Sequence, residues 1–291
     1  MTVYSEIGDL TPGQFHRFAQ FIYARSNINL KEQKITLLSN RLRKRLMALN
    51  LKSFDEYFDL ISGPGGKQEL VHFLEVVTTN ETYFWRTTAN FTMLREEILP
   101  DLLRRFPGQK LQFWSAGCST GEEPYNIAIE LVEGMKRTGV FDFQIVATDL
   151  SARVLDFARE ARYAGRKIDK IPEPVLRRYF RPDTEKAGYY RVRDDIRERV
   201  EFRLENLFET NRSGLHCIIC RNVMIYFRRE DQEVLVNRFY RALRPGGYLI
   251  VGHSESLHML KTQFKPRNMK NGVSYFRDPD AIHQSVSPRD A

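Results

Sequence analysis

The feature that most constrains the fold of this chain is the stretch from Phe113 to Tyr125. An apolar run that predicts a strand breaks into small residues and glycines, and apolar residues at helical spacing follow from Ile127 to Met135. Strand, tight turn and helix in this order are typical of open α/β sheets, in which ligands bind outside the carboxyl ends of the strands. A turn with a purely structural role would have the same pattern.

The glycine spacing of this turn differs from that of a phosphate-binding loop. Gly117 and Gly121 do not match the dinucleotide fingerprint, and the second glycine is not followed by a lysine and a hydroxyl residue. Two carboxylates, Glu122 and Glu123, follow instead. Because they repel a phosphate and attract a cation, we expect the ligand to carry positive charge at this turn.

Each of the following predicted strands also ends in a polar residue. The strand from Phe143 to Thr148 ends at Asp149, and later strands end at Asn206 and near Asn222. A carboxylate in the position of Asp149 can accept hydrogen bonds from both hydroxyls of a ribose, although it could instead cap the next helix. A carboxylate for a ribose, amides for a base and glutamates for a cation together indicate S-adenosylmethionine.

Composition limits the class of protein. The chain has 291 residues, of which 42% are hydrophobic and 28% charged, as in soluble globular proteins. We expect a cytoplasmic protein without membrane insertion, because there is no secretory leader pattern and no apolar run of about 18 residues. Cys217 and Cys220 should be unreactive core thiols on opposite faces of a strand. The net charge of +8 suits a nucleic acid, a membrane surface or an acidic protein.

One predicted helix, from Ile35 to Leu49, carries several cations on one face. No carboxylate lies between Gln33 and Asn50 to pair with them. The face could therefore be solvated, or it could dock an acidic partner. The cations proposed for docking are Arg41, Arg43, Lys44 and Arg45.

Four motifs resemble those of the CheR family of chemotaxis receptor methyltransferases, and the resemblance extends over nearly the whole chain. They are Asn80-x-Thr82-x-x-x-Arg86, Ser115 to Tyr125, Cys220 to Phe227, and Gly252 to Ser256. The resemblance implies a class I S-adenosylmethionine-dependent methyltransferase with a Rossmann-like, mostly parallel seven-stranded sheet. It also implies an all-α N-terminal domain and a small antiparallel β insertion.

With this resemblance the chain divides into domains and a linker. The predicted parts are an all-helical receptor-docking domain (1–77), a linker that contributes to the active site (78–90), a catalytic domain (91–278) with an insertion at about 163–199, and a disordered tail (279–291). The helix that opens the catalytic domain is expected to end at Pro100, since proline disfavours the helical conformation of the residue before it.

The resemblance further implies methyl transfer to glutamate side chains of membrane chemoreceptors, with S-adenosylhomocysteine as the second product. Arg86 is expected to orient the acceptor carboxylate beside Tyr226, which is equally compatible with a packed aromatic role. The implied cofactor contacts are Asn80, Thr82, Arg86, Gly117, Glu122, Glu123, Asp149, Asn206, Leu207, Asn222 and Val223.

This chemistry requires little from the protein besides positioning. A glutamate carboxylate is already ionised near neutral pH, so no general base is needed, and no metal is expected.

The partner is expected to be the cytoplasmic helical domain of a chemoreceptor, and the enzyme to be a monomer. Alternatives are a methyltransferase acting on another protein or on RNA, or a cofactor-binding docking module without catalysis. Nucleic acid is not expected, because aromatic and basic residues do not interleave.

Overall fold

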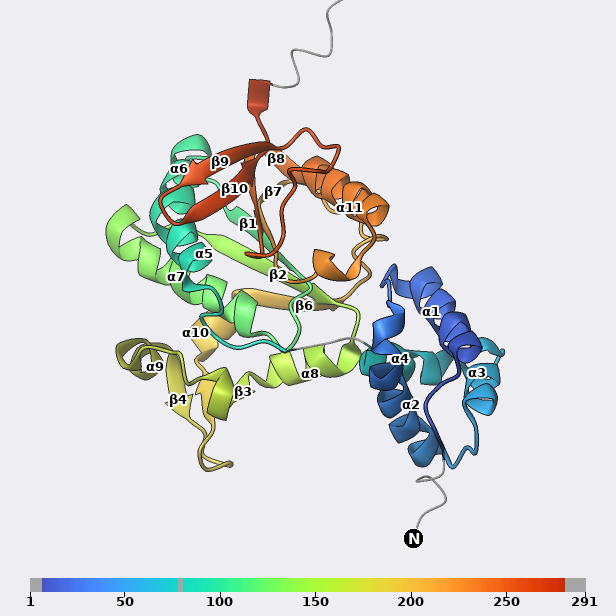
Figure 1. Cartoon of the computed structure of the whole chain (residues 1–291). Helices are drawn as coiled ribbons and strands as arrows, with labels where there is room; N and C mark the ends of the chain where they lie inside the picture. Colours follow the sequence, from blue (N-terminus) through green and yellow to red (C-terminus); the bar gives the residue numbers. More distant parts are fainter. Residues whose placement is uncertain (1–6, 78–80, 281–291) are drawn as a thin grey trace, which may run out of the picture.

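The computed structural model describes residues 7–77 and 81–280 (Figure 1). Asn80 and almost all of the predicted tail therefore lie outside the described residues. None of the helices in the described part of the chain is long and apolar enough to cross a membrane.

The N-terminal unit is entirely helical, as predicted. A capping box begins its first helix, in which the Thr11 side chain accepts from the Gln14 amide while the Gln14 side chain accepts from the Thr11 amide. Large apolar side chains such as Phe18, Leu42 and Phe73 are fully buried between the helices. The described helices of this unit are α1 (Pro12–Ser26), the short η2 (Glu32–Lys34), α2 (Ile35–Leu49), α3 (Phe54–Ser62) and α4 (Lys67–Val77).

The second unit, which corresponds to the predicted catalytic domain and is here called the catalytic unit, is built on a seven-stranded sheet with the order β6-β2-β1-β7-β8-β10-β9. The first five strands pair in parallel, and β10 pairs antiparallel with both β8 and β9. The strands are β1 (Leu111–Ala116), β2 (Phe143–Asp149), β6 (Val200–Leu204), β7 (Leu215–Cys220), β8 (Leu243–Val251), β9 (Lys265–Met269) and β10 (Gly272–Phe276). The predicted mostly parallel sheet is confirmed.

Successive residues of the central strands pack into separate cores on the two faces of this sheet. Phe113 and Ile219 belong to one core, whereas Trp114 and Ile218 belong to the core that also contains the N-terminal helices. This alternation follows from the two-residue period of a strand. It also separates Cys217 from Cys220, which are buried free thiols as predicted.

Helices cover both faces of the sheet. α11 (Arg229–Ala242) packs into the core shared with the N-terminal unit. The other core includes residues of α5 (Thr88–Met93), α6 (Leu99–Arg105), α7 (Glu122–Thr138), α8 (Ala152–Glu160) and α10 (Asp194–Arg197).

The predicted antiparallel insertion is present between α8 and β6. Its sheet has the order β3-β5-β4. Figure 1 shows this small sheet and the N-terminal helices on opposite sides of the molecule. The elements of the insertion are β3 (Arg162–Tyr163), η4 (Gly165–Lys167), α9 (Glu173–Tyr179), β4 (Phe180–Pro182) and β5 (Tyr190–Val192), followed by α10.

One predicted helix end is wrong. The chain stays helical past Pro100, because a π-helical stretch, η3 (Leu94–Ile98), separates α5 from α6 and places Pro100 in the first turn of α6. Proline disfavours but does not exclude the helical conformation of the residue before it, and Leu99 keeps that conformation with a φ of −59° and a ψ of −48°.

The N-terminal unit contacts the catalytic unit through α11 and the segment before it. Asp231 accepts hydrogen bonds from the Tyr23 hydroxyl at 2.9 Å and from the Asn27 amide at 3.0 Å. The backbone amide of Asn29 donates to the carbonyl of Tyr226 at 2.8 Å. The end of α1 and the loop after it are thereby fixed beside the carboxyl ends of the parallel strands.

Candidate functional site

The turn between β1 and α7 is tight because of its glycines. Gly117 has a φ of 83° and Gly121 a φ of 91°, values that L side chains rarely adopt. A Cβ on Gly117 would lie 2.5 Å from the nearest methyl carbon of Val223, and one on Gly121 would lie 2.7 Å from the Ala158 Cβ. The two glycines therefore allow the turn to pack against its neighbours.

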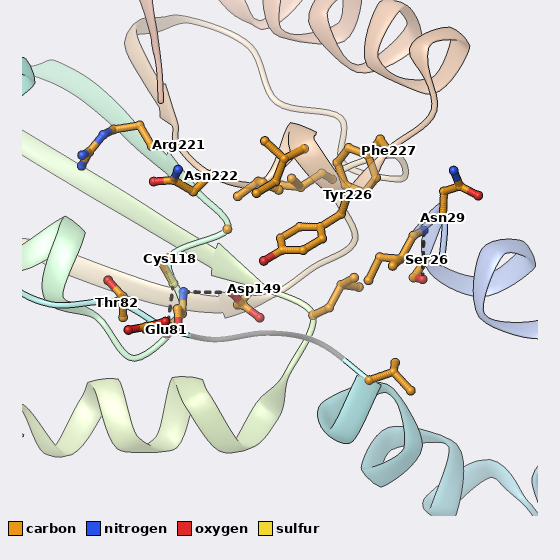
Figure 2. A pocket seen from close by; sticks show the side chains of 18 of the residues that line it. Ser26, Asn29, Glu81, Thr82, Cys118, Asp149, Arg221, Asn222, Tyr226 and Phe227 are labelled. Atoms are coloured by element: carbon orange, nitrogen blue, oxygen red, sulfur yellow. Dashed lines mark hydrogen bonds between the residues drawn. The ribbon is translucent and has the colours of Figure 1, made fainter. Parts of the chain in front are cut away.

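A cavity of about 620 Å³ lies at the carboxyl ends of the strands, between the two units (Figure 2). Lining residues come from the N-terminal unit, the segment after residue 80 and the strand ends. The structure brings together these predicted site residues: Arg41, Thr82, Arg86, Gly117, Glu123, Asp149, Asn206, Leu207, Asn222, Val223 and Tyr226.

Asp149 lies at the end of β2 with its carboxylate beside the turn. It accepts hydrogen bonds from the backbone amides of Ser119 at 2.9 Å and Ser151 at 3.1 Å. Burial raises the pKa of the Asp149 carboxyl, and these amides oppose the rise. The cap of α8 is Ser151, whose side chain accepts from Val154. Asp149 is thus left to face the cavity, as Figure 2 shows.

The two glutamates at the start of α7 do not act together, contrary to the sequence-based interpretation. Glu122 is fully buried, does not line the cavity, and forms an ion pair with Lys167. The Thr120 hydroxyl also donates to Glu122, at 2.7 Å. The predicted cofactor contact of Glu122 therefore has no support in the geometry, because a lysine from the insertion already binds this carboxylate.

Glu123 does line the cavity and has a cation beside it. It accepts from the Ser115 hydroxyl at 2.8 Å and from the Arg221 guanidinium at 3.1 Å. Burial raises the pKa of the Glu123 carboxyl, whereas Arg221 lowers it. Arg221 also donates to the carbonyl of Arg86 and lies over the Phe91 ring.

Sequence reasoning missed Arg221 as a site residue. It lies inside a recognised motif, and an arginine directly after a fully buried strand was the available signal. The Arg221 side chain is 3% exposed and lines the cavity. The wall formed by Glu123 and Arg221 thus presents both a carboxylate and a guanidinium, which suits a zwitterionic group.

Glu255 is a second residue that the sequence interpretation left without a role. Its carboxylate accepts from four backbone amides, those of Asn222, Val223, Met224 and Gly252, at 2.7–3.0 Å. Asn222 has a φ of 60°, which is uncommon for a residue other than glycine. Glu255 therefore holds the cavity-lining segment after β7 in place.

Asn206 is partly engaged within its own turn. Its side-chain oxygen accepts from the amide of Phe208 at 3.0 Å, and its amide nitrogen lies 3.2 Å from a Glu209 carboxylate oxygen. Asn206 and Leu207 nevertheless line the cavity.

Arg86 and Tyr226 reach the cavity from different parts of the chain. The Arg86 guanidinium donates to the carbonyl of Glu81 at 2.8 Å. Tyr226 belongs to the short helix η5 (Met224–Tyr226), and Figure 2 shows its hydroxyl directed toward the centre of the cavity. This orientation favours a site role for Tyr226 over that of a packed aromatic.

The four predicted docking cations do not form one exposed basic face. Arg43 pairs with Asp9, and Arg45 makes two hydrogen bonds of 2.7 and 2.8 Å to Glu69. These carboxylates lie outside the segment 33–50 in the sequence, so the reasoning from local charge was wrong. Arg41 donates to the carbonyl of Val77 and lines the cavity, and burial lowers its pKa.

Within the described residues, no group of three or more His, Cys, Asp or Glu side chains could hold a metal ion.

Comparison with protein families decides the assignment. The model described as "CheR methyltransferase, SAM binding domain" matches residues 80–273, and "CheR methyltransferase, all-alpha domain" matches residues 13–78. The chain belongs to the CheR methyltransferase family. This CheR protein is therefore an S-adenosylmethionine-dependent methyltransferase.

Curated relatives of this CheR protein are similar over most of their length. Chemotaxis protein methyltransferase 2 of Pseudomonas aeruginosa is 41% identical over 84% of this chain and 87% of its own. Chemotaxis protein methyltransferase 2 of Vibrio cholerae is 32% identical over 92% and 94%. The chemotaxis protein methyltransferase of Escherichia coli is 35% identical over 89% of each chain.

The cavity suits the cofactor that this family uses. Its lining presents a carboxylate at Asp149, and a carboxylate beside a guanidinium at Glu123 and Arg221. Neither a phosphate-binding lysine nor a phosphate loop is present at the turn. The donor set thus matches a nucleoside with an amino-acid arm.

Proposed function

We propose that this enzyme transfers a methyl group from S-adenosylmethionine to glutamate side chains of chemoreceptors, forming methyl esters. The observation that carries the proposal is the division of charge around the cavity. The charged lining residues of the N-terminal unit are all cations: Lys31, Lys34 and Arg41. The strand ends and the turn supply three carboxylates, Glu123, Asp149 and Glu205, and one guanidinium, Arg221, which is paired with Glu123. The segment after residue 80 adds one charge of each sign, Glu81 and Arg86.

This division matches the charges of the two reactants. The sulfonium and ammonium of the cofactor are cationic, whereas an acceptor glutamate is anionic near neutral pH. A cofactor on the carboxylate side and an acceptor on the basic side are therefore both stabilised by Coulomb attraction. No histidine is among the described residues that line the cavity, and an ionised acceptor needs no general base.

The charged residues of the cavity and Tyr226 have distinct roles in this proposal. Asp149 accepts from the ribose hydroxyls, and Glu123 and Arg221 bind the ammonium and carboxylate of the amino-acid end. Arg86 orients the acceptor carboxylate, with the Tyr226 hydroxyl beside it. Rate enhancement then comes chiefly from holding two reactants in line.

The geometry favours a docking surface different from the one that the sequence suggested. Lys31 and Lys34 are exposed in the segment just before α2 and line the cavity together with Leu37, which is 40% exposed. We propose that this basic and apolar rim docks the acidic receptor helix that carries the methylated glutamate.

The test combines labelled S-adenosylmethionine with receptor fragments and asks whether base releases the label. We expect base-labile label, because methyl esters hydrolyse readily. We expect Arg86→Ala to lower turnover at least about a hundredfold while cofactor binding is partly kept. Arg104→Ala is the control, since that side chain is 70% exposed and is not among the residues that line the cavity. Base-stable label would contradict glutamate methylation, and wild-type turnover in Arg86→Ala would contradict the role of Arg86.

A further inference from the structure

The backbone on either side of Arg86 has an unfavourable conformation. Trp85 has a φ of 57° and Thr87 a φ of 58°, so two residues with side chains lie in the left-handed region. Such conformations persist only where surrounding contacts fix them. The contacts of this segment therefore determine where the Arg86 side chain is directed.

One face of α7 supplies the decisive contacts. The Asn126 side-chain oxygen accepts from the backbone amide of Trp85 at 2.7 Å, and a Glu130 oxygen accepts from the Trp85 indole nitrogen at 3.1 Å. Asn126 and Glu130 are 0% and 3% exposed. The Arg95 guanidinium donates a hydrogen bond of 2.8 Å to the second carboxylate oxygen of Glu130. Both hydrogen bonds are therefore shielded from water, which strengthens them.

The same helix face reaches the cofactor side of the cavity. Glu123, Asn126 and Glu130 have the spacing i, i+3, i+7, which places them along one stripe of a helix. Glu123 lines the cavity, whereas Asn126 and Glu130 do not. A single rigid element thus connects the cofactor wall to the segment that carries Arg86.

Only the oxygen of the Asn126 side-chain amide makes a hydrogen bond among the described residues. Its amide nitrogen is buried and has no hydrogen-bond partner among the described residues. A buried donor without a partner is unfavourable, so the contact to Trp85 is retained at a cost to stability.

We propose that Asn126 and Glu130 are positioning residues that hold Trp85 in its left-handed conformation and thereby direct the next residue, Arg86, to the methyl-transfer site. The inference rests on the proposed role of Arg86. Arg221 contributes from the other side, because it donates to the Arg86 carbonyl. Neither Asn126 nor Glu130 contacts a reactant in this proposal.

The test compares Asn126→Leu with Asn126→Asp. Leucine removes the acceptor, and we expect kcat to fall at least about tenfold with the cofactor dissociation constant within about threefold of wild type. Aspartate keeps a carboxyl oxygen for the Trp85 amide and is expected to restore most of kcat. Glu133→Gln is the matched control, because Glu133 lies on the same helix but binds Lys136, Arg178 and Tyr179 instead.

A spectroscopic measurement shows whether a loss of activity is accompanied by a displaced Trp85, as a positioning role requires. The chain has two tryptophans, so in a Trp114→Phe background the fluorescence reports Trp85 alone. Asn126→Leu should increase its quenching by acrylamide, and Glu133→Gln should not. Unchanged kcat and unchanged fluorescence in Asn126→Leu, with Arg86→Ala inactive, would overturn the inference and leave the proposed function standing. A fully active Arg86→Ala would instead overturn the role of Arg86.

A second variant covers the case in which Asn126→Leu does not fold. Trp85→Phe removes the indole donor to Glu130 and keeps an aromatic ring. We expect kcat to fall several-fold with cofactor affinity kept, and an unchanged kcat would overturn the role of Glu130.

Discussion

Glu122 and Glu123 are adjacent in the sequence but have different environments. Glu122 is buried against Lys167, and Glu123 lies at the cavity with Ser115 and Arg221. Burial raises the pKa of both carboxyls, and a cation opposes the rise in each case. A ligand ammonium at Glu123 therefore meets a carboxylate that already has a partner, and the guanidinium is left to receive a ligand carboxylate.

At the scale of single residues, His216 predicts a pH dependence of stability. The side chain is buried, and its Nδ1 accepts from the amide of Gln112 at 2.9 Å. Burial lowers the pKa of His216 from 6.5 to about 4. Because the folded protein binds this proton more weakly than the unfolded chain, the stability is fully present above pH 6.5 and is lost as the pH falls toward about 4.

The difference between 6.5 and about 4 corresponds to at most about 3 kcal/mol. The measurement is the free energy of unfolding by urea at several pH values, for wild type and for His216→Asn, which keeps an acceptor but does not titrate. We expect the wild type to lose more stability than the variant between pH 6.5 and 4. Parallel curves for the two proteins would contradict the prediction.

At the scale of elements, the loop after β7 depends on a carboxylate from the loop after β8. Glu255 accepts from four backbone amides, so Glu255→Gln turns part of this acceptor into a donor that faces amides. We expect the affinity for S-adenosylmethionine to fall about tenfold or more, because Asn222 and Val223 lose their fixed position.

Titration calorimetry with S-adenosylmethionine measures this loss. Glu233→Gln is the control, since Glu233 also accepts from a loop amide, that of Lys261, but lies outside the cavity lining. Wild-type affinity in a folded Glu255→Gln protein would show that the carboxylate supports the fold alone.

At the scale of the whole molecule, the active site is shared between two units. The N-terminal unit lines the cavity with Lys31, Lys34 and Leu37, and Asp231 anchors that unit to α11. The acceptor is thus expected to meet the N-terminal unit and the catalytic unit at the same time.

This arrangement predicts that Lys34→Glu raises KM for a receptor fragment several-fold and reduces its dependence on salt, because exposed charges are screened by ions. Lys44→Glu is the matched control, since Lys44 is exposed on α2, the helix that follows Lys34, but does not line the cavity. Methylation rates at several salt concentrations provide the measurement. Equal effects of the two substitutions would place receptor docking on another surface.

Much of the fold follows from local patterns. The helix caps at Thr11 and Ser151 involve residues only three positions apart. The alternation of buried residues in β1 and β7 likewise has a period of two residues, so the sequence determines both features. The strand β9 gave no such signal, because Lys265–Met269 forms an edge strand that contains a proline and buries little.

The sequence by itself determined the strand, turn and helix at Gly117, the polar residues at the strand ends and the family. Only the tertiary structure decided which charged side chains are paired within the protein and which can meet a ligand. Lys167 binds Glu122, Glu69 binds Arg45, and α7 holds the segment around Arg86 through residues some 40 positions away. The physical reason is that ion pairs and hydrogen bonds depend on distance in space, which spacing along the chain does not give.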